Sequence, residues 1–441
     1  MKKMTAILLA VLFLFAAAAC KKLPASNPNP SPSLPVASFE EVSEPSSSGE
    51  SSSGFSSMVS SSDSSSDDYS DTSSSEPYLP PPTTPLNHSD HHCYSYLTDI
   101  QKQYYNSMHT AAEQMHASWV VLGPLTENYT ADVAVVRHAL VTDHPDIFWL
   151  PPYYVTASGT DADDNPAALI MFSSSAEVSP SYNITRAEKA YMEQELTTAV
   201  ALIISQVTSS DPFEIELQLH DMLCQKVTYS LDPSDPYIYT AYGALVNGSA
   251  LCEGYSRAMQ LLLNQFDIQS TTISGVAAGA GHMWNAVKIG EDWHHLDATW
   301  NDTATGFISH EYFGLTDEEI LKDHVFANDS SALTPEELAS GAVSFNTFRP
   351  VCTNGNYNFF LKKGFVFGAE NLSELAEYVA NATENAVEVK FSDPEFKEQF
   401  AQNSETVLQE LSSLLALNHG ANYYIGRYSV SVHTLKLYKT V

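Results

Sequence analysis

Apolar side chains recur at helical or strand spacing through most of the chain beyond residue 90. The spacing predicts helices over 97–115, 131–140, 185–207 and from Pro212 onward, and strands over 118–122, 147–155 and 167–172. Two of these helices have clear starts, because Thr185 and Glu188 form a capping box and Asp211 precedes a proline at the first helical position. Residues 91–182 are therefore predicted to form an N-terminal α+β region, which names no chemistry.

A second mixed pattern occupies the end of the chain. It predicts a strand over 357–367, a helix over 372–379, a strand over 386–391, a helix over 394–417 and a strand over 423–438. This β-α-β-α-β order is typical of a small separate α+β domain, which we place at residues 331–441.

The residues between these regions, 183–330, carry the patterns on which a function can be argued. Apolar residues from Tyr255 to Phe266 repeat at helical spacing with Ser249 as the expected cap, so Cys252 falls in the first turn of a helix. Two alternating runs, HMWNAVKI and WHHLDATW, flank the turn residues GED and predict a β-hairpin. The later run FGLTDEEILKDH is typical of a short helix after a strand end.

The start of the chain predicts where in the cell the protein works. Residues 1–20 hold two lysines, an apolar run and four alanines before Cys20, which predicts an export signal too short to be a trusted membrane span. The stretch Ala17–Cys20 resembles a bacterial lipobox, with alanine where that pattern usually has leucine, and implies a lipid anchor on Cys20 at the outer face of the cytoplasmic membrane. Plain secretion is the alternative.

Residues 21–90 are rich in Ser, Pro and acidic side chains, and such a segment buries too little apolar surface to offset its ordering entropy. We therefore predict a disordered linker there. Over the whole chain 53 acidic residues outnumber 20 basic ones, for a formal charge of -33. This charge excludes nucleic acid as a partner, because phosphate binding needs clustered Lys and Arg.

Five cysteines and a short histidine run have to be placed. Cys252 must stay reduced if it is a nucleophile, so the four cysteines left after acylation of Cys20 are not assigned to two bridges, and a bridge between Cys93 and Cys352 stays open. The run that begins at His88 and ends at Cys93 has no second ligand pair, and we predict no metal site there.

Cys252, His282 and Asp297 follow one another in the order of a Cys-His-Asp nucleophilic triad. Helix amides and the helix dipole favour an anion at Cys252 and would lower the pKa of its thiol from ~8.5, although a small buried residue would also fit this position. His282 opens a strand after the Gly-rich stretch SGVAAGAG and shares a face with Trp284, although a histidine beside apolar residues is often a satisfied core group.

The register of the hairpin decides whether His282 and Asp297 meet. A two-residue loop puts both on one face with an offset, a three-residue loop puts them on opposite faces, and a bulge corrects either. Asp292 and Asp302 are less suitable substitutes, because one lies in the turn and the other past the strand. The residues alone leave these alternatives open.

Together the segments HDMLCQKVTYS, AYGALVNGSALCEGYSRA, GHMWNAVKIGEDWHHLDATWND and YFGLTDEEILKDH resemble bacterial members of the transglutaminase-like superfamily, over roughly residues 213–324. The resemblance implies an α+β fold with a papain-like core, in which Cys252 is the nucleophile, His282 the general base and acid, and Asp297 the residue that orients the imidazole. It also implies an oxyanion site at the Cys252 amide with a second donor, for which Tyr242 is a candidate.

The resemblance implies a surface-anchored thiol acyl enzyme that acts on protein or peptide amides through a thioester on Cys252, with the cell wall and neighbouring surface proteins as candidate substrates. An amine acceptor would make it a transglutaminase and water a peptidase or amidase, and the sequence does not choose between them. No cofactor or metal is implied, and no calcium loop is visible. A non-catalytic surface-binding or adhesion lipoprotein that reuses the fold is the alternative, and a solute-binding lipoprotein gains nothing from the triad order. The oligomeric state is not indicated.

Overall fold

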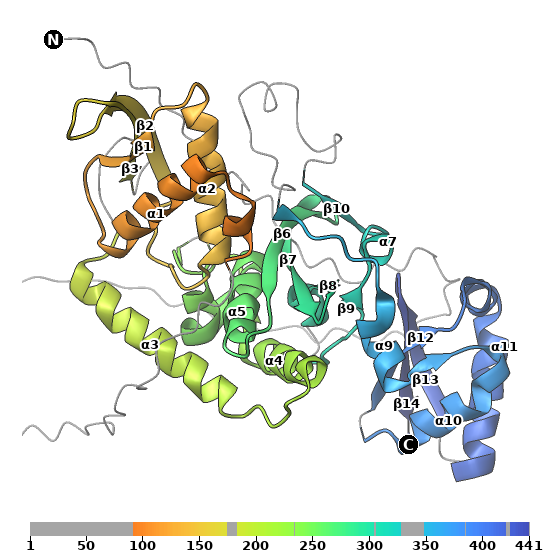
Figure 1. Cartoon of the computed structure of the whole chain (residues 1–441). Helices are drawn as coiled ribbons and strands as arrows, with labels where there is room; N and C mark the ends of the chain where they lie inside the picture. The colour runs from red at the N-terminus through yellow and green to blue at the C-terminus, as the bar shows by residue number, and fades with distance from the viewer. Residues whose placement is uncertain are drawn as a thin grey trace, which may run out of the picture. The chain divides into compact units, whose positions relative to one another are not determined.

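A computed structural model describes residues 91–173, 183–232, 234–303, 306–327, 348–383, 385–419 and 424–440. These residues form four β-sheets together with helices (Figure 1). Cys20, His88 and the predicted signal and linker lie outside the described residues. The predictions about them, like the predicted domain boundaries, stay predictions.

The N-terminal part is a three-stranded antiparallel sheet that shares an apolar core with two helices. Its elements are η1 (Cys93–Tyr96), α1 (Asp99–Glu113), β1 (Val120–Pro124), α2 (Tyr129–Asp143), β2 (Tyr153–Thr160) and β3 (Pro166–Ser173), with strand order β1-β3-β2. The predicted helices and two of the predicted strands are confirmed. The strand predicted from residue 147 is wrong at its start, because the chain turns through Pro151 and Pro152, which lack the N–H group of a strand residue, and pairs only from Tyr153.

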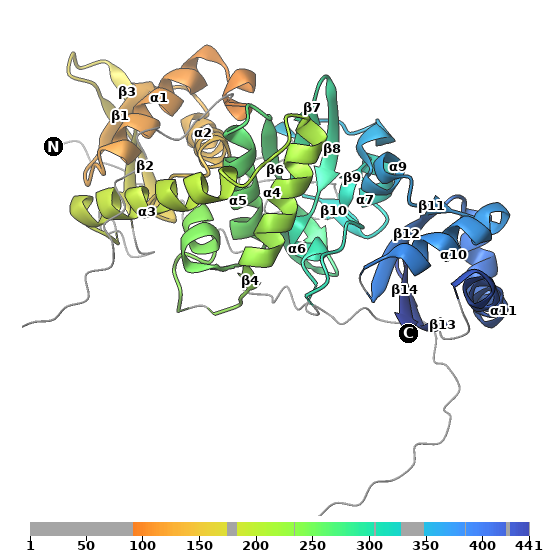
Figure 2. The ribbon, with the colours of Figure 1, turned by 90° about the horizontal axis from the view of Figure 1, so that it is seen from below.

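Two capped helices then lead into the central part, as predicted. In α3 (Arg186–Ile204) the Thr185 side chain accepts a hydrogen bond from the Glu188 amide, and in α4 (Pro212–Lys226) Asp211 accepts from the amides of Phe213 and Glu214. Figure 2 shows α4 beside α5, the helix that carries Cys252.

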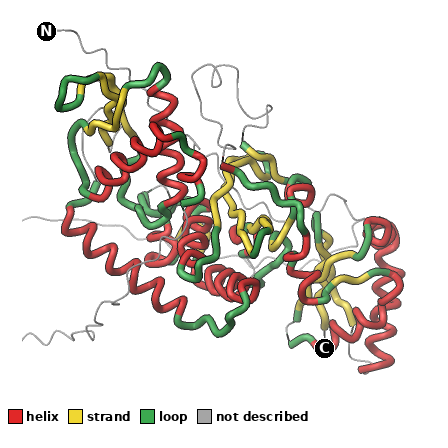
Figure 3. The backbone as a smooth tube through the Cα atoms, viewed as in Figure 1, coloured by secondary structure: helices red, strands yellow, loops and turns green. Residues whose placement is uncertain are grey.

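The central part packs α5 against a five-stranded antiparallel sheet (Figure 3). Its elements are β4 (Thr228–Tyr229), the π-helical turn η2 (Gly243–Asn247), β5 (Ser249–Ala250), α5 (Cys252–Asn264), β6 (Ser270–Ala277), β7 (Ala280–Ile289), β8 (Asp292–Leu296), α6 (Ala298–Asn301), β9 (Phe313–Leu315), α7 (Asp317–Ile320) and β10 (His324–Phe326). The strand order is β10-β6-β7-β8-β9. A helix packed on an antiparallel sheet in this way is an α+β, papain-like arrangement, and the predicted fold class is confirmed.

The β7-β8 hairpin settles the register that the sequence left open. Ile289 pairs with Asp292 across a two-residue turn, and Gly290 takes the left-handed φ of 63° that such a turn requires. Asn285 pairs with Leu296, so Asp297 follows directly after the last paired residue. Of the predicted alternatives, the two-residue loop is the one found.

The C-terminal part is a four-stranded sheet of order β11-β12-β14-β13 that packs against two helices. Its elements are η4 (Gly355–Tyr357), α9 (Phe359–Lys363), β11 (Val366–Phe367), η5 (Ala369–Asn371), α10 (Leu372–Asn381), β12 (Ala386–Phe391), α11 (Pro394–His419), β13 (Tyr424–Val430) and β14 (Thr434–Thr440). The helix over 372–379 and β12 are confirmed, and the helix predicted over 394–417 is found as α11 with a kink at Asn403, whose φ of -130° and ψ of 34° are not helical.

Two strand predictions in this part are wrong. In place of the strand predicted over 357–367, the chain forms the short helix α9, which is followed by Gly364 in the left-handed conformation at φ 73°, and only Val366–Phe367 pair as a strand. The long final strand is instead the hairpin of β13 and β14, since the chain turns between Val430 and Thr434. Among the helices of the described residues, none is long and apolar enough to cross a membrane.

Candidate active site

Cys252 is the first residue of α5, and the residue is 9% exposed. The predicted cap, Ser249, is wrong: Gly248 turns the chain at φ 69°, Ser249 pairs with Thr228 in a short parallel ladder, and the N-cap is Leu251. Leucine has no side-chain oxygen to satisfy the first helix amides. The thiol therefore lies at a helix N-terminus whose dipole and N–H groups favour an anion.

The loop before η2, residues 234–242, passes close to the first turn of α5. The Leu251 amide donates to the Ile238 carbonyl at 2.8 Å. A Cβ atom on Gly254 would lie 2.6 Å from that same oxygen, so glycine permits this approach. Tyr239, on the loop, is 39% exposed, and burial together with the charges of Glu253 and Cys252 raises the pKa of its hydroxyl. The sequence analysis did not single out Tyr239, which is the exposed aromatic side chain of this loop beside the thiol.

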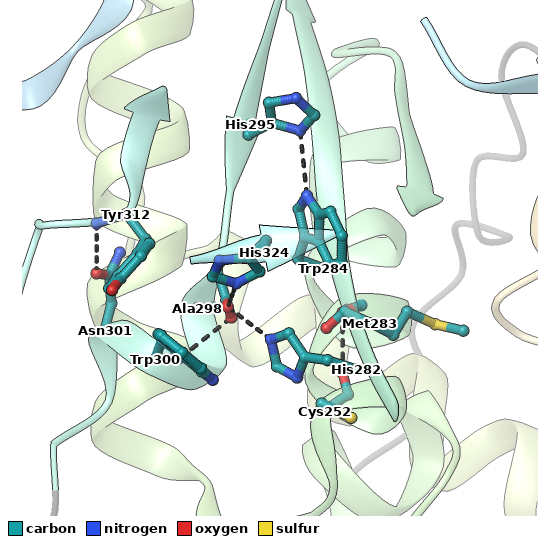
Figure 4. A network of polar contacts seen from close by, with 12 residues as sticks. Cys252, His282, Met283, Trp284, His295, Ala298, Trp300, Asn301, Tyr312 and His324 are labelled. Carbon is teal, nitrogen blue, oxygen red and sulfur yellow. Dashed lines mark hydrogen bonds and ion pairs between the residues drawn. The ribbon is translucent and has the colours of Figure 1, made fainter. Parts of the chain in front are cut away.

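His282 is buried near the start of β7, and its Nε2 atom lies 2.6 Å from Asp297 Oδ2. With Nε2 engaged by the carboxylate, Nδ1 is the ring nitrogen left for proton exchange with a thiol. In the view of Figure 4 the His282 ring lies above Cys252. Trp284 stacks on the ring at a centroid distance of 5.9 Å, and the two side chains share a strand face, as predicted.

Asp297 is fully buried and caps α6, because its Oδ1 atom accepts a hydrogen bond from the Trp300 amide at 3.1 Å. Burial alone would raise the pKa of this carboxyl, but the charges and hydrogen bonds of His282 and His324 hold it well below its usual range. The alternative aspartates serve elsewhere. Asp302 accepts from the Tyr255 hydroxyl, and Asp292 accepts from the Asn354 amide.

Two polar side chains tie α5 to the strand that carries His282. The Ser256 hydroxyl lies 2.8 Å from the Cys252 carbonyl and 3.0 Å from the Met283 carbonyl. Asn285 donates from its side-chain amide to the Ser256 carbonyl at 2.9 Å. These contacts fix the start of α5 against β7, so the thiol and the imidazole are positioned by one buried network. Neither residue was predicted, since no local pattern marks them.

His324, the first residue of β10, is a further member of the site that the sequence analysis missed. Its Nε2 atom lies 3.2 Å from the same Asp297 oxygen that His282 contacts, and its Nδ1 atom lies 2.6 Å from Asp323. The side chain is completely buried. The Tyr312 hydroxyl donates to the other oxygen of Asp323 at 2.6 Å. The Asp297 carboxylate is thus shared by two histidines.

Tyr242, the predicted second oxyanion donor, is placed differently. Its hydroxyl donates to Glu195 on α3 at 2.6 Å, and its ring packs against Phe148 and Tyr237. The hydroxyl group is engaged by the α3 carboxylate, so the structure gives this prediction no support. The Cys252 amide remains the donor supported by helix position.

Two histidine clusters outside the predicted triad have metal-ligand spacing, but their proton positions do not fit a metal. In the first, the Trp284 indole donates to His295 Nδ1, so the ring proton lies on Nε2 and points to Asp317. Burial also raises the pKa of the third member, the Cys352 thiol. Ligation would need the deprotonated Nε2 atom and a thiolate.

The second cluster contains His220, Asp221 and His310. Asn301 accepts the Tyr312 amide through Oδ1, so its Nδ2 group donates to His220 Nε2 and leaves the ring proton on Nδ1 toward Asp221. Both clusters are therefore histidine–carboxylate hydrogen-bond pairs. The third cluster joins His324 to two residues of the predicted triad, His282 and Asp297, and its 2.6 Å contact between His282 and Asp297 is shorter than the roughly 3.3 Å between ligands of a tetrahedral zinc ion.

The remaining cysteines are buried and separate. None of the four cysteines within the described ranges forms a disulfide, so the bridge left open between Cys93 and Cys352 is absent from the structure. Cys224 belongs to α4 and donates to the Ala298 carbonyl. His92, from the short histidine run, contacts the Phe348 carbonyl through its ring.

This combination of a thiol at a helix start, an imidazole on an antiparallel strand and a carboxylate after the next strand is the arrangement of papain-like cysteine enzymes. Residues 202–298 match the family model of the transglutaminase-like superfamily. The chain therefore contains a transglutaminase-like domain, and the resemblance seen in the sequence is confirmed.

Three individual proteins were found to be similar. Kyphoscoliosis peptidase of the mouse, Mus musculus, is 25% identical over 125 residues, which are 23% of this chain and 19% of that protein, so the chain spans only a small part of its relative. A solved structure described as a TGase aligns over 34% of this chain and 46% of its own, with 12% identity and a TM-score of 0.23. A candidate cysteine protease from Cytophaga hutchinsonii aligns over 40% and 68%, with 10% identity and a TM-score of 0.22.

Proposed function

We propose that this protein is a thiol acyl enzyme, a transglutaminase-like acyltransferase or cysteine peptidase, that acts on protein or peptide amides with Cys252, His282 and Asp297 as its triad. The 2.6 Å contact between His282 and Asp297, beside a thiol at an uncapped helix start, is the observation that carries the proposal. A binding protein has no need for a buried carboxylate that orients an imidazole in this way.

The proposed reaction has two halves, formation of a thioester on Cys252 and its release to an acceptor. The Cys252 thiolate attacks the amide carbonyl carbon, a C–S bond forms, and the carbonyl electron pair moves to an oxyanion beside the amides at the start of α5. The His282 imidazolium gives its Nδ1 proton to the leaving nitrogen, the C–N bond breaks, and a thioester remains. Asp297 accepts the Nε2–H group throughout and stabilises the positive ring. Each oxyanion donor would contribute about 3 to 4 kcal/mol.

The second half decides the type of enzyme. An acceptor, either water or an amine, loses a proton to His282 and attacks the thioester, and the C–S bond breaks to restore the thiolate. Water yields hydrolysis and an amine yields a new amide. The described residues of the site favour neither acceptor over the other, so both outcomes belong to the proposal.

We also propose that the enzyme works outside the cytoplasmic membrane, anchored by a lipid on Cys20, on cell-wall peptides or neighbouring surface proteins. The first 20 residues and the linker composition support this. Fractionation of cells that express wild type or Cys20→Ser tests it: the variant should lose radiolabelled fatty acid and leave the membrane fraction. Wild-type protein without label would remove the anchor and favour plain secretion.

The proposed activity is tested by trapping the thioester. Purified full-length protein is incubated with a peptide library, quenched in acid and analysed by mass spectrometry for acyl adducts on Cys252. We expect adducts in wild type, none in Cys252→Ala, and adducts in a control, Cys352→Ala, that removes a buried thiol elsewhere. Parallel incubations before the quench, one in buffer and one in buffer with a primary amine, show whether water or the amine releases the adduct.

The non-catalytic alternative makes the opposite forecast. A surface-binding protein would turn over no peptide, and its Cys252 would react with iodoacetamide with the pH dependence of an ordinary thiol. A Cys252→Ala protein that processed every wild-type substrate would sink the proposed triad.

A further inference from the structure

His324 lies between two carboxylates. Asp323 is 2.6 Å from its Nδ1 atom, and Asp297 is 3.2 Å from its Nε2 atom. The ring is fully buried, and Trp300, Trp284 and Tyr312 enclose it at centroid distances of 4.6, 5.0 and 5.5 Å. In Figure 4 His324 and Trp300 lie on the side of His282 away from Met283.

This geometry requires two ring protons. A neutral imidazole carries one N–H group and one lone pair, and with one proton directed to either carboxylate the lone pair would face the other. Two buried lone pairs pointing at each other are unfavourable, and an imidazolium satisfies both contacts with charge-assisted hydrogen bonds. Burial opposes this charge, but the hydrogen bonds to Asp297 and Asp323 raise the pKa of His324 above its ordinary value.

We propose that His324 is a positively charged positioning residue, which shares Asp297 with His282 and so sets the pH range in which the Cys252–His282 pair is active. The inference rests on the proposed function, because it assigns a partner to the proposed triad aspartate. His324 does not act on the substrate. It acts through the Asp297 carboxylate, which interacts with two positively charged rings instead of one.

The sign of the effect follows from charge. A positive His324 partly neutralises Asp297 and repels a second positive ring at 5.5 Å, so it makes the His282 imidazolium easier to deprotonate. His282 can then give its proton to the leaving nitrogen more readily. Without the His324 charge, Asp297 would stabilise the His282 imidazolium alone, and the proton would be held to higher pH.

The charged and titratable groups that face His324 come from its own segment and from the elements packed against it. Asp323 comes from its own segment, Asp297 from the junction of β8 and α6, and His282 from β7. The Tyr312 hydroxyl reaches it through Asp323. On the neighbouring strand β6, the paired residue is Ala277, which has no charge.

The test measures the pH dependence of Cys252 alkylation, which needs no knowledge of the substrate. The full-length protein is treated with iodoacetamide across a pH series, and modification of the Cys252 peptide is followed by mass spectrometry. Wild type is expected to show two inflections, one for formation of the thiolate–imidazolium pair and one for loss of the imidazolium proton. In His324→Gln, which keeps an N–H donor but no charge, we expect the upper inflection to rise by about one pH unit.

Two further variants make the test specific. Asp323→Asn removes one of the two carboxylates that hold the His324 charge, and we expect it to move the upper inflection in the same direction. His310→Gln breaks a comparable contact, in which Nε2 lies 2.9 Å from Asp221 outside the site, and should leave the profile where it is. If His324→Gln fails to fold, Asp323→Asn and a histidine-ring NMR titration of the wild type decide the question.

The outcomes separate the two proposals. An unmoved upper inflection in both His324→Gln and Asp323→Asn, or a His324 ring that titrates near pH 6.5 in the NMR series, would overturn the role of His324 and leave the triad standing. A wild-type Cys252 that alkylates as an ordinary thiol, with no second inflection, would instead overturn the proposed function itself.

Discussion

Asp297 is the most widely shared side chain of the candidate site. One of its oxygens accepts the Trp300 amide at the start of α6, and the other accepts from His282 and His324. A single buried carboxylate therefore caps a helix and holds two rings. Its negative charge, and not only its shape, is what these partners require.

Asp297→Asn tests that requirement. The asparagine oxygen can still cap α6, so the fold should persist, but the neutral amide cannot stabilise an imidazolium or enforce the Nε2–H tautomer. We expect turnover to fall by about 10³-fold or more, measured as kcat on a substrate found by thioester trapping. Asp302→Asn, which changes a carboxylate bonded to Tyr255, is the matched control. An Asp297→Asn enzyme within about tenfold of wild type would mean that another group orients His282.

At this scale the sequence predicts the residues whose signal is local. Cys252 follows from a helix start and His282 from a strand start. Asp297 follows only if the turn has two residues, and the resemblance chose it among three aspartates. His324 has no local signal, because only the pairing of β10 with β6 brings it beside Asp297. The Ser249 cap failed because Gly248 bends the chain into a short strand first.

Helix α5 and the loop before η2 form the element-scale framework of the site. The loop backbone passes so close to α5 that Gly254 has no room for a side chain, with Ala250 Cβ at 2.7 Å and the Ile238 carbonyl at 2.6 Å from an added Cβ atom. Both neighbours belong to backbone-anchored segments. The position of Cys252 therefore depends on this glycine two residues away.

Gly254→Ala is expected to push the loop off α5. Overpacking of this kind costs about 1 to 3 kcal/mol of unfolding free energy, and the displaced thiol should react more slowly with iodoacetamide. Chemical denaturation and alkylation rates measure the two effects. Gly355→Ala is the control, because its added Cβ atom would meet Thr316 at an ordinary 3.8 Å. Equal stability of the two variants would show that the loop can yield.

The element predictions fail where a turn interrupts an apolar run. In the C-terminal part the apolar run around Phe359 suggested a strand, but Gly364 provides the left-handed position that ends a helix. The capped helices α3 and α4 were found because their first turns carry side-chain signals. Patterns of two or three apolar residues do not distinguish a short helix from a strand.

On the scale of the whole molecule, a buried polar junction joins the central part to the C-terminal sheet. Glu388 of β12 accepts from the Ser309 hydroxyl and the His310 amide, and Lys436 of β14 lies 3.3 Å from it. Glu311 accepts the His433 amide from the turn between β13 and β14. No sequence pattern predicts this junction, because its members are spread over residues 309–436.

Glu311 is a residue of this junction whose surroundings disfavour a negative charge. Burial and the neighbouring Glu388 charge raise its pKa to about 7. An unfolded glutamate has a pKa of about 4.3, so the unfolded chain gives up this proton more readily than the folded one. The contribution of protonated Glu311 to the free energy of unfolding is therefore fully present below about pH 4.3 and is lost as the pH rises through about 7.

Glu311→Gln mimics the protonated carboxyl at every pH and can still accept the His433 amide. We expect it to be up to about 3 kcal/mol more stable than wild type at pH 8 and nearly equal at pH 4.5, measured by chemical denaturation at both values. Burial also lowers the pKa of His433 to about 4, but that contribution is common to both proteins and cancels in their difference. A stability difference that is the same at both pH values would show that Glu311 is charged in the folded protein throughout, with its charge balanced by Lys436 across the junction.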